Sequence, residues 1–104
     1  MIVEERIYTI KIGKLKAYLD LYEAEGMPVQ TRILPRMVGY FTTEIGPLHT
    51  VVHMWAYENL AERDEKRAEL MRDPDWQRYI SKIAEFIERQ ENRILIPTSI
   101  SPLR

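Results

Sequence analysis

The apolar residues of this chain change their spacing several times, and each change predicts a boundary between two elements. Residues Ile2 to Ile10 are rich in β-branched side chains, which is typical of a strand. From Leu15 to Tyr22 the apolar residues recur at helical spacing, and we expect this helix to stop at Gly26, a residue common after helix ends. A short second helix is predicted from Pro28 to Leu34.

The middle of the chain predicts a β-hairpin. Two apolar runs, Val38–Ile45 and Thr50–Tyr57, flank the turn-forming pair Gly46-Pro47. If Ile45 pairs with Thr50, this register decides which hairpin side chains share a face, and a loop one residue different would reverse the assignment. The residues that this register puts on the same face as His53 are Tyr40, Thr42 and Glu44.

Two helices and a strand are predicted in the last half of the chain. Asn59 is a suitable N-cap for a helix over Leu60–Arg72, and Asp73-Pro74 marks the start of another. The second helix carries an apolar stripe between Trp76 and Ile87. A short strand is expected at Arg93–Ile96, where Pro97 ends the ladder.

The predicted order is therefore β-α-β-β-α-β in a single domain, residues 1–104. This order predicts an α+β fold of the ferredoxin-like type, with one antiparallel sheet and helices packed on one of its faces. Right-handed connections would place the first and third strands side by side in the centre of the sheet.

The third strand is the most informative segment for function. Alternate side chains of a strand point to opposite faces, so His53, Trp55 and Tyr57 share one face. All three combine a large flat ring with a polar group, which is typical of a cavity lining. The neighbouring first strand groups Glu4, Arg6 and Tyr8 in the same way.

We expect the helices to cover the opposite and plainly apolar face of the sheet. The face that carries the imidazole and the indole would then need another cover, because it is too apolar to stay in water. A second copy of the chain would supply that cover, so the sequence predicts a homodimer, or a higher homo-oligomer, around a shared cavity. The residues assigned to the helix-covered face are Val3, Ile7, Val52 and Met54.

Three residues are the candidate catalytic groups. Arg6 and Tyr8 would orient a ligand, and His53 could transfer a proton near neutral pH. Alternatively, His53 only shapes the cavity, and Glu4 forms an ion pair with Arg6 across the subunit boundary. The candidate ligand-binding residues are Glu4, Tyr40, Glu44, Trp55 and Tyr57.

Composition excludes several classes of function. The net charge is −1, from 15 basic and 16 acidic residues that are interspersed, so the basic surface of a nucleic-acid-binding protein is not expected. No apolar run reaches the length of a membrane helix, and no secretion signal is present, so we expect a cytoplasmic protein. Without cysteines or nucleotide-binding motifs, we expect neither a metal site nor a bound cofactor.

Arg63 and Arg67 lie four residues apart on one helix face among several acidic residues. Such a face could bind an anion, although a solvated, salt-bridged surface is its usual meaning.

Several short motifs together resemble the NIPSNAP family over most of the chain, from Glu4 to about Pro102. They are Glu4-x-Arg6-x-Tyr8, Gly39-Tyr40-Phe41 with Gly46, Val52-His53-x-Trp55-Ala56-Tyr57, Arg63-x-x-x-Arg67 and Arg93-Ile94-Leu95-Ile96-Pro97. The resemblance implies a dimeric α+β barrel, in which two ferredoxin-like sheets close around a central cavity.

The resemblance leaves three functions open. Dimeric α+β barrels include cofactor-independent monooxygenases, isomerases and haem-handling proteins, while NIPSNAP relatives of animals are associated with mitochondria, vesicle traffic and protein contacts. Our leading interpretation is a small-molecule-binding protein, as a cofactor-independent oxygenase or isomerase. A non-enzymatic interaction protein and a haem-handling protein are the alternatives.

Overall fold

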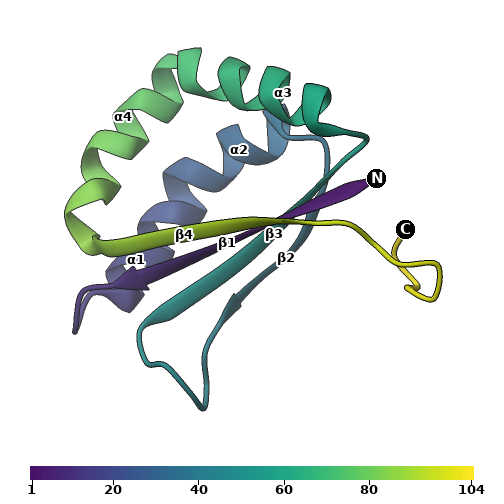
Figure 1. Ribbon diagram of the computed structural model, residues 1–104. Helices are drawn as coiled ribbons and strands as arrows, with labels where there is room; N and C mark the ends of the chain where they lie inside the picture. Colours follow the sequence, from purple (N-terminus) through teal and green to yellow (C-terminus); the bar gives the residue numbers. More distant parts are fainter.

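The computed structural model describes all 104 residues and contains one four-stranded antiparallel sheet with its helices on one face (Figure 1). The strand order is β2-β3-β1-β4, so the first and third strands are central. The predicted α+β, ferredoxin-like class is therefore confirmed. The strands are β1 (Ile2–Ile10), β2 (Met37–Thr42), β3 (Thr50–Tyr57) and β4 (Ile87–Leu95).

The first connection is one continuous helical segment and not two separate helices. It comprises α1 (Leu15–Leu21), a π-helical turn η1 (Tyr22–Gly26) and α2 (Met27–Ile33). The prediction that Gly26 ends a helix is wrong, because its φ of −83° is ordinary right-handed helical backbone. Gly26 instead permits close packing: a Cβ there would lie 2.7 Å from Tyr79 Cζ and 2.8 Å from Tyr22 Cδ1.

The second connection begins at the predicted caps. Helix α3 (Leu60–Arg72) starts at Asn59, whose Oδ1 accepts a hydrogen bond of 2.9 Å from the Glu62 backbone N–H. Helix α4 (Pro74–Ile83) starts at Asp73, whose Oδ1 accepts from two backbone N–H groups, and the turn η2 (Ala84–Phe86) leads into β4. No helix of the structure is both long enough and apolar enough to cross a bilayer.

The hairpin has the predicted faces but a different register. Tyr40 shares a face with His53, as expected, but it lies opposite His53, whereas the predicted register would place it opposite Trp55, and β2 ends at Thr42 and not at Ile45. The longer loop turns through Gly46 (φ 135°) and His49 (φ 59°), both in the left-handed region. Glu44 therefore lies exposed in this loop and is not on the strand face that carries His53, so its assignment to the cavity lining is wrong.

Strand β4 is longer than the predicted segment. Pairing with β1 begins at Ile87, opposite Ile10, and continues to Leu95. The run Glu88–Asn92 contains no apolar residue, because this strand lies at the edge of the sheet and is mostly exposed. A search for apolar alternation therefore finds only its last residues.

The expected assignment of the two sheet faces is also wrong. The helices cover the face of His53, Trp55 and Tyr57, all of which are buried within a single chain. Trp55 and Tyr57 bury more apolar surface than the smaller side chains opposite them, which favours this face for the core. The other face stays partly open in the single chain, with 53% of Phe41 and 37% of Val38 exposed. A second copy is therefore not needed to cover His53.

Replacing Gly26 with Ala tests the close packing of the first connection. At an exposed helical site this change stabilises a protein by roughly 1 kcal/mol through helix propensity. Here the added Cβ overlaps two tyrosine rings, so we expect a loss of about 1–3 kcal/mol in the free energy of unfolding. Urea denaturation of G26A gives the sign directly. Exposed Ala24 in the same turn provides the control, since A24S should change stability by less than about 0.5 kcal/mol.

Candidate functional site

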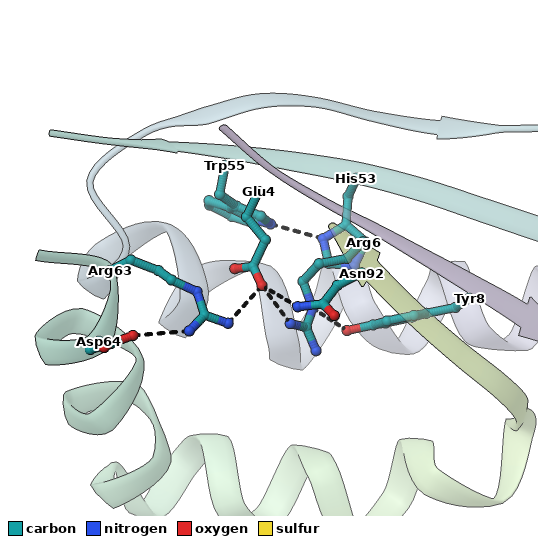
Figure 2. A network of polar contacts seen from close by, with 8 residues as sticks. All are labelled: Glu4, Arg6, Tyr8, His53, Trp55, Arg63, Asp64 and Asn92. Atoms are coloured by element: carbon teal, nitrogen blue, oxygen red, sulfur yellow. Dashed lines mark hydrogen bonds and ion pairs between the residues drawn. The ribbon is translucent and has the colours of Figure 1, made fainter. Parts of the chain in front are cut away.

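The site is organised around Glu4, a fully buried carboxylate on β1. Its Oε2 accepts hydrogen bonds from Arg6 Nη1 at 3.0 Å, Arg63 Nη2 at 2.8 Å and Asn92 Nδ2 at 2.8 Å. These donors come from β1, α3 and β4, and Figure 2 shows all three side chains pointing toward the same carboxylate oxygen. The ion pair of Glu4 and Arg6 therefore forms within one chain and not across a subunit boundary.

The surroundings of Glu4 keep it ionised. Burial alone would raise the pKa of this carboxyl group, but the hydrogen bonds from Arg63 and Asn92 and the charges of Arg6 and Arg67 outweigh burial and lower the pKa to about 2. A carboxylate with such a pKa accepts protons poorly near neutrality. Glu4 therefore positions arginine side chains and does not act as a base.

His53 lies beside this network in a fixed protonation state. Its Nδ1 accepts a hydrogen bond of 2.8 Å from Trp55 Nε1, and its ring stacks on Tyr40 with centroids 4.6 Å apart (Figure 2 shows the first contact). Burial, together with the charges of Arg6 and Arg67, lowers the pKa of His53 from 6.5 to about 3.

A neutral imidazole whose Nδ1 accepts a hydrogen bond must carry its proton on Nε2. The Nε2–H group of His53 is buried and has no acceptor in the protein. This geometry suits a hydrogen-bond donor to a ligand oxygen better than the general base that the sequence suggested.

A cleft of about 450 Å³ opens between the sheet and the helices α3 and α4. Its polar side is formed mainly by Arg6 and Tyr8 of β1, Arg67 of α3 and Gln90 of β4. Arg6 Nε donates a hydrogen bond of 2.9 Å to the Tyr8 hydroxyl oxygen, which leaves the Tyr8 proton available to another acceptor. The apolar wall consists of Met71, Trp76, Ile80, Ile83, Ala84 and Ile87.

A smaller inner chamber of about 30 Å³ adjoins the cleft and shares Tyr8, Gln30 and part of the apolar wall with it. This volume is enough for about one water molecule or one ligand oxygen atom. His53 lines the chamber, as do the hydroxyl-bonded pair Tyr18 and Tyr40, whose oxygens are 2.7 Å apart. Burial raises the pKa of both tyrosines, so they are neutral.

The structure keeps four of the candidate residues together. Arg6 and Tyr8 line the cleft, and Tyr8 also lines the inner chamber with His53 and Tyr40, its ring centroid 4.9 Å from that of His53. The remaining candidates lie elsewhere: Glu4 beneath the arginines, Trp55 against His53, Tyr57 in the core and Glu44 in the exposed loop.

Sequence reasoning missed Asn92 and Gln90, which lie in the polar strand that it did not detect, and it undervalued Arg63 and Arg67. The four-residue spacing of the two arginines was the available signal. No cluster of three or more His, Asp or Glu side chains has a geometry that could hold a metal ion.

Comparison with known proteins decides the family. The NIPSNAP family model matches residues 3–102. The chain belongs to the NIPSNAP family. It is 34% identical over 98 residues to human NipSnap homolog 3A, a match that covers 90% of this chain and 39% of that protein. The curated NipSnap relatives are longer than the segment they share with this chain, which spans between about a quarter and less than half of their length.

Solved structures support the same assignment. A NIPSNAP family protein from Agrobacterium tumefaciens is 51% identical, with a TM-score of 0.97, and the match covers 99% of this chain and 98% of that one. A putative antibiotic biosynthesis monooxygenase from Nitrosomonas europaea has a TM-score of 0.69 at 14% identity, covering 93% of this chain and 98% of that one. The second likeness concerns the fold alone.

The low pKa of His53 predicts a loss of stability in mild acid. Above pH 6.5 the imidazole of His53 is neutral in both the folded and the unfolded chain. No free energy of unfolding is therefore lost to protonation of His53 in this range. Below pH 6.5 His53 becomes protonated in the unfolded chain, whereas in the folded chain it stays neutral down to about pH 3. We expect the free energy of unfolding to fall by about 2 kcal/mol between pH 7 and pH 5 from this group.

Urea denaturation at several pH values measures this loss. The slope should largely disappear in H53Q and persist in H49N, because Asn tolerates the left-handed backbone at position 49. An unchanged slope in H53Q would show that His53 is not the group responsible.

Proposed function

We propose that this NIPSNAP protein is a cytoplasmic protein that binds a small organic molecule in the cleft between the sheet and helices α3 and α4. One observation carries the proposal: the buried Arg67 Nη1 and His53 Nε2 atoms make no hydrogen bond in the protein, and these two residues line, respectively, a cleft of about 450 Å³ and the chamber that adjoins it. Buried polar groups are nearly always hydrogen-bonded in native proteins. A largely apolar cleft with a few such groups is the usual form of a ligand site.

The chemistry of the site favours stabilisation of a negative or partly negative oxygen. The His53 Nε2–H group and the Tyr8 hydroxyl can each donate a hydrogen bond to a ligand. Neither Glu4 nor His53 takes up a proton near neutral pH, because both pKa values are strongly lowered. An oxygenase or isomerase reaction without a bound cofactor would therefore depend on polarising a substrate carbonyl, because Glu4 and His53 supply no base that could form an enolate.

The haem-handling alternative is not favoured by the position of His53. An axial ligand needs an imidazole nitrogen that the haem iron can reach. The His53 side chain is only 1% exposed, its Nδ1 is hydrogen-bonded to Trp55, and the chamber beside it holds about 30 Å³.

Blocking the cleft tests the proposal. Ala84 lines the cleft but is exposed, so A84W should fill the space with little strain. We expect small molecules that co-purify with the parent protein to be lost from A84W, as measured by mass spectrometry after denaturation. A68W places the same ring on an exposed position of α3 outside the lining and is the matched control. Identical small-molecule content in parent and A84W, or no binding of any fragment by ligand-observed NMR, would contradict the proposal.

We further propose that the open sheet face binds a second copy of the chain. The half-buried apolar residues of this face are Ile7, Val52 and Met54, next to the more exposed Phe41 and Val38. Only the segment after β4 folds over one end of it, where Thr98, Ser101 and Leu103 meet Val3 and Val38.

Phe41→Glu tests the dimer without disturbing the core, because more than half of the Phe41 side chain is exposed. A buried, unpaired charge at the seam should weaken association by at least about tenfold. Light scattering with size-exclusion chromatography should find a dimeric parent and a monomeric F41E. Ile12 is 83% exposed in the turn after β1, so I12E makes the same change elsewhere and should stay dimeric. A monomeric parent would refute the dimer.

A further inference from the structure

The positive charges around Glu4 are not balanced by the carboxylates near them. Three guanidinium groups act on Glu4: Arg6 and Arg63 through ion pairs and Arg67 through its charge. Arg63 also pairs with Asp64 at 3.0 Å. Two carboxylates therefore face three cations, and the network is left with one positive charge in excess.

Arg67 is the cation without a counterion. It forms no ion pair, whereas the more exposed Arg32 and Arg93 pair with Asp73 and Glu5. Its Nη1 is buried and makes no hydrogen bond of good geometry, although the Tyr57 hydroxyl lies close to the guanidinium group and the residue lines the cleft. Burying a charged donor without a partner is costly, so such a group is usually held for an anion.

The remaining charged groups of the cleft do not supply that anion. Glu88 is the only carboxylate among the lining residues, and it is exposed on the edge strand β4 with no ion pair. Arg89 also lines the cleft and adds a further positive charge, partly offset by its own pair with Glu91. The polar side of the cleft is thus positive overall.

The opposite wall of the cleft is apolar, and some of its side chains are exposed to solvent. Trp76 and Ile83 are buried there, but 54% of Met71 and 36% of Ile80 are exposed at its edge. Exposed apolar side chains that border a cavity indicate a surface that a ligand can cover.

We propose that the ligand of this cleft is an amphipathic organic acid, whose carboxylate binds Arg67 beside Arg6 and whose apolar body packs along the stripe of α4. The inference rests on the proposed function and adds the chemical class of the ligand. A guanidinium group suits this role because its planar set of N–H donors matches a carboxylate.

The two tryptophans provide separate reporters for the test. The chain has two indole N–H groups: that of Trp76, a residue that lines the cleft, is buried without a partner, and that of Trp55 is hydrogen-bonded to His53. We would titrate ¹⁵N-labelled protein with octanoate and 3-phenylpropanoate, and with octanamide and 3-phenylpropanamide as neutral matches. The acids should shift the Trp76 indole resonance, and the amides should bind at least about tenfold more weakly.

Variants of α3 assign the preference to one residue. R67Q should weaken binding of both acids by about tenfold or more and leave the amides unchanged. K66Q removes the same charge from the neighbouring position, which does not line the cleft, and should bind like the parent. R67K keeps the charge without the planar donor pair, so it should bind the acids with intermediate affinity, and it serves if R67Q does not fold.

The outcomes separate this inference from the proposed function. Amides that bind as tightly as acids would overturn the preference for an acid and leave a ligand-binding cleft. Acids that bind R67Q as well as the parent would overturn the role of Arg67. If none of the four compounds shifts the Trp76 resonance, the inference is wrong, and the A84W comparison decides the proposed function independently.

Discussion

The burial of a single carboxylate, Glu4, is the constraint on which the rest of this structure depends. A buried charge is tolerated only when partners compensate its loss of hydration, and here the partners come from β1, α3 and β4. The carboxylate therefore connects the central strand, the edge strand and the helical layer at one point. Removing one partner from such a network typically costs about 3–5 kcal/mol, which is a large fraction of the stability of a small domain.

The same network determines the chemistry of the neighbouring aromatic residues. Burial lowers the pKa of His53, and the charges of Arg6 and Arg67, which also act on Glu4, lower it further. Trp55 then selects the tautomer, because its indole N–H can only donate. His53 is consequently neutral with an available Nε2–H group, and this state follows from groups on three different elements. The imidazole resembles a catalytic base in the sequence but is a donor in the folded chain.

Most of the fold could be predicted because its signals are local. The bounds of β1, β3 and α3 follow from β-branched runs and from the cap at Asn59. The hairpin register was misjudged by two residues, since the loop turns through His49 in a left-handed conformation that no sequence rule required. The role of Gly26 was predicted incorrectly because it depends on a distant contact. A glycine is needed there to make room for the ring of Tyr79, which lies more than fifty residues away in the sequence.

Part of the composition of the candidate site could be predicted, but its location could not. Both sheet faces are apolar enough to form a core, and the simpler aliphatic face seemed the better one. The mixed face is buried because Arg63 and Asn92 satisfy Glu4 across 59 and 88 residues of chain, contacts that periodicity does not reveal. Tyrosines on the helices likewise supply hydroxyl partners for the polar rings.

The side chains of strand β1 have different surroundings on the two faces of the sheet. Glu4 and its alternate neighbours face the helices and the cleft, whereas Glu5 pairs with Arg93 on the open face. Because adjacent residues of one strand point in opposite directions, the proposed ligand site and the proposed subunit interface would be chemically separate although they share a backbone. A displacement of β1 would affect both faces at once, and its central position between β3 and β4 opposes that motion. Each face can therefore be altered by substitution without direct contact with the other.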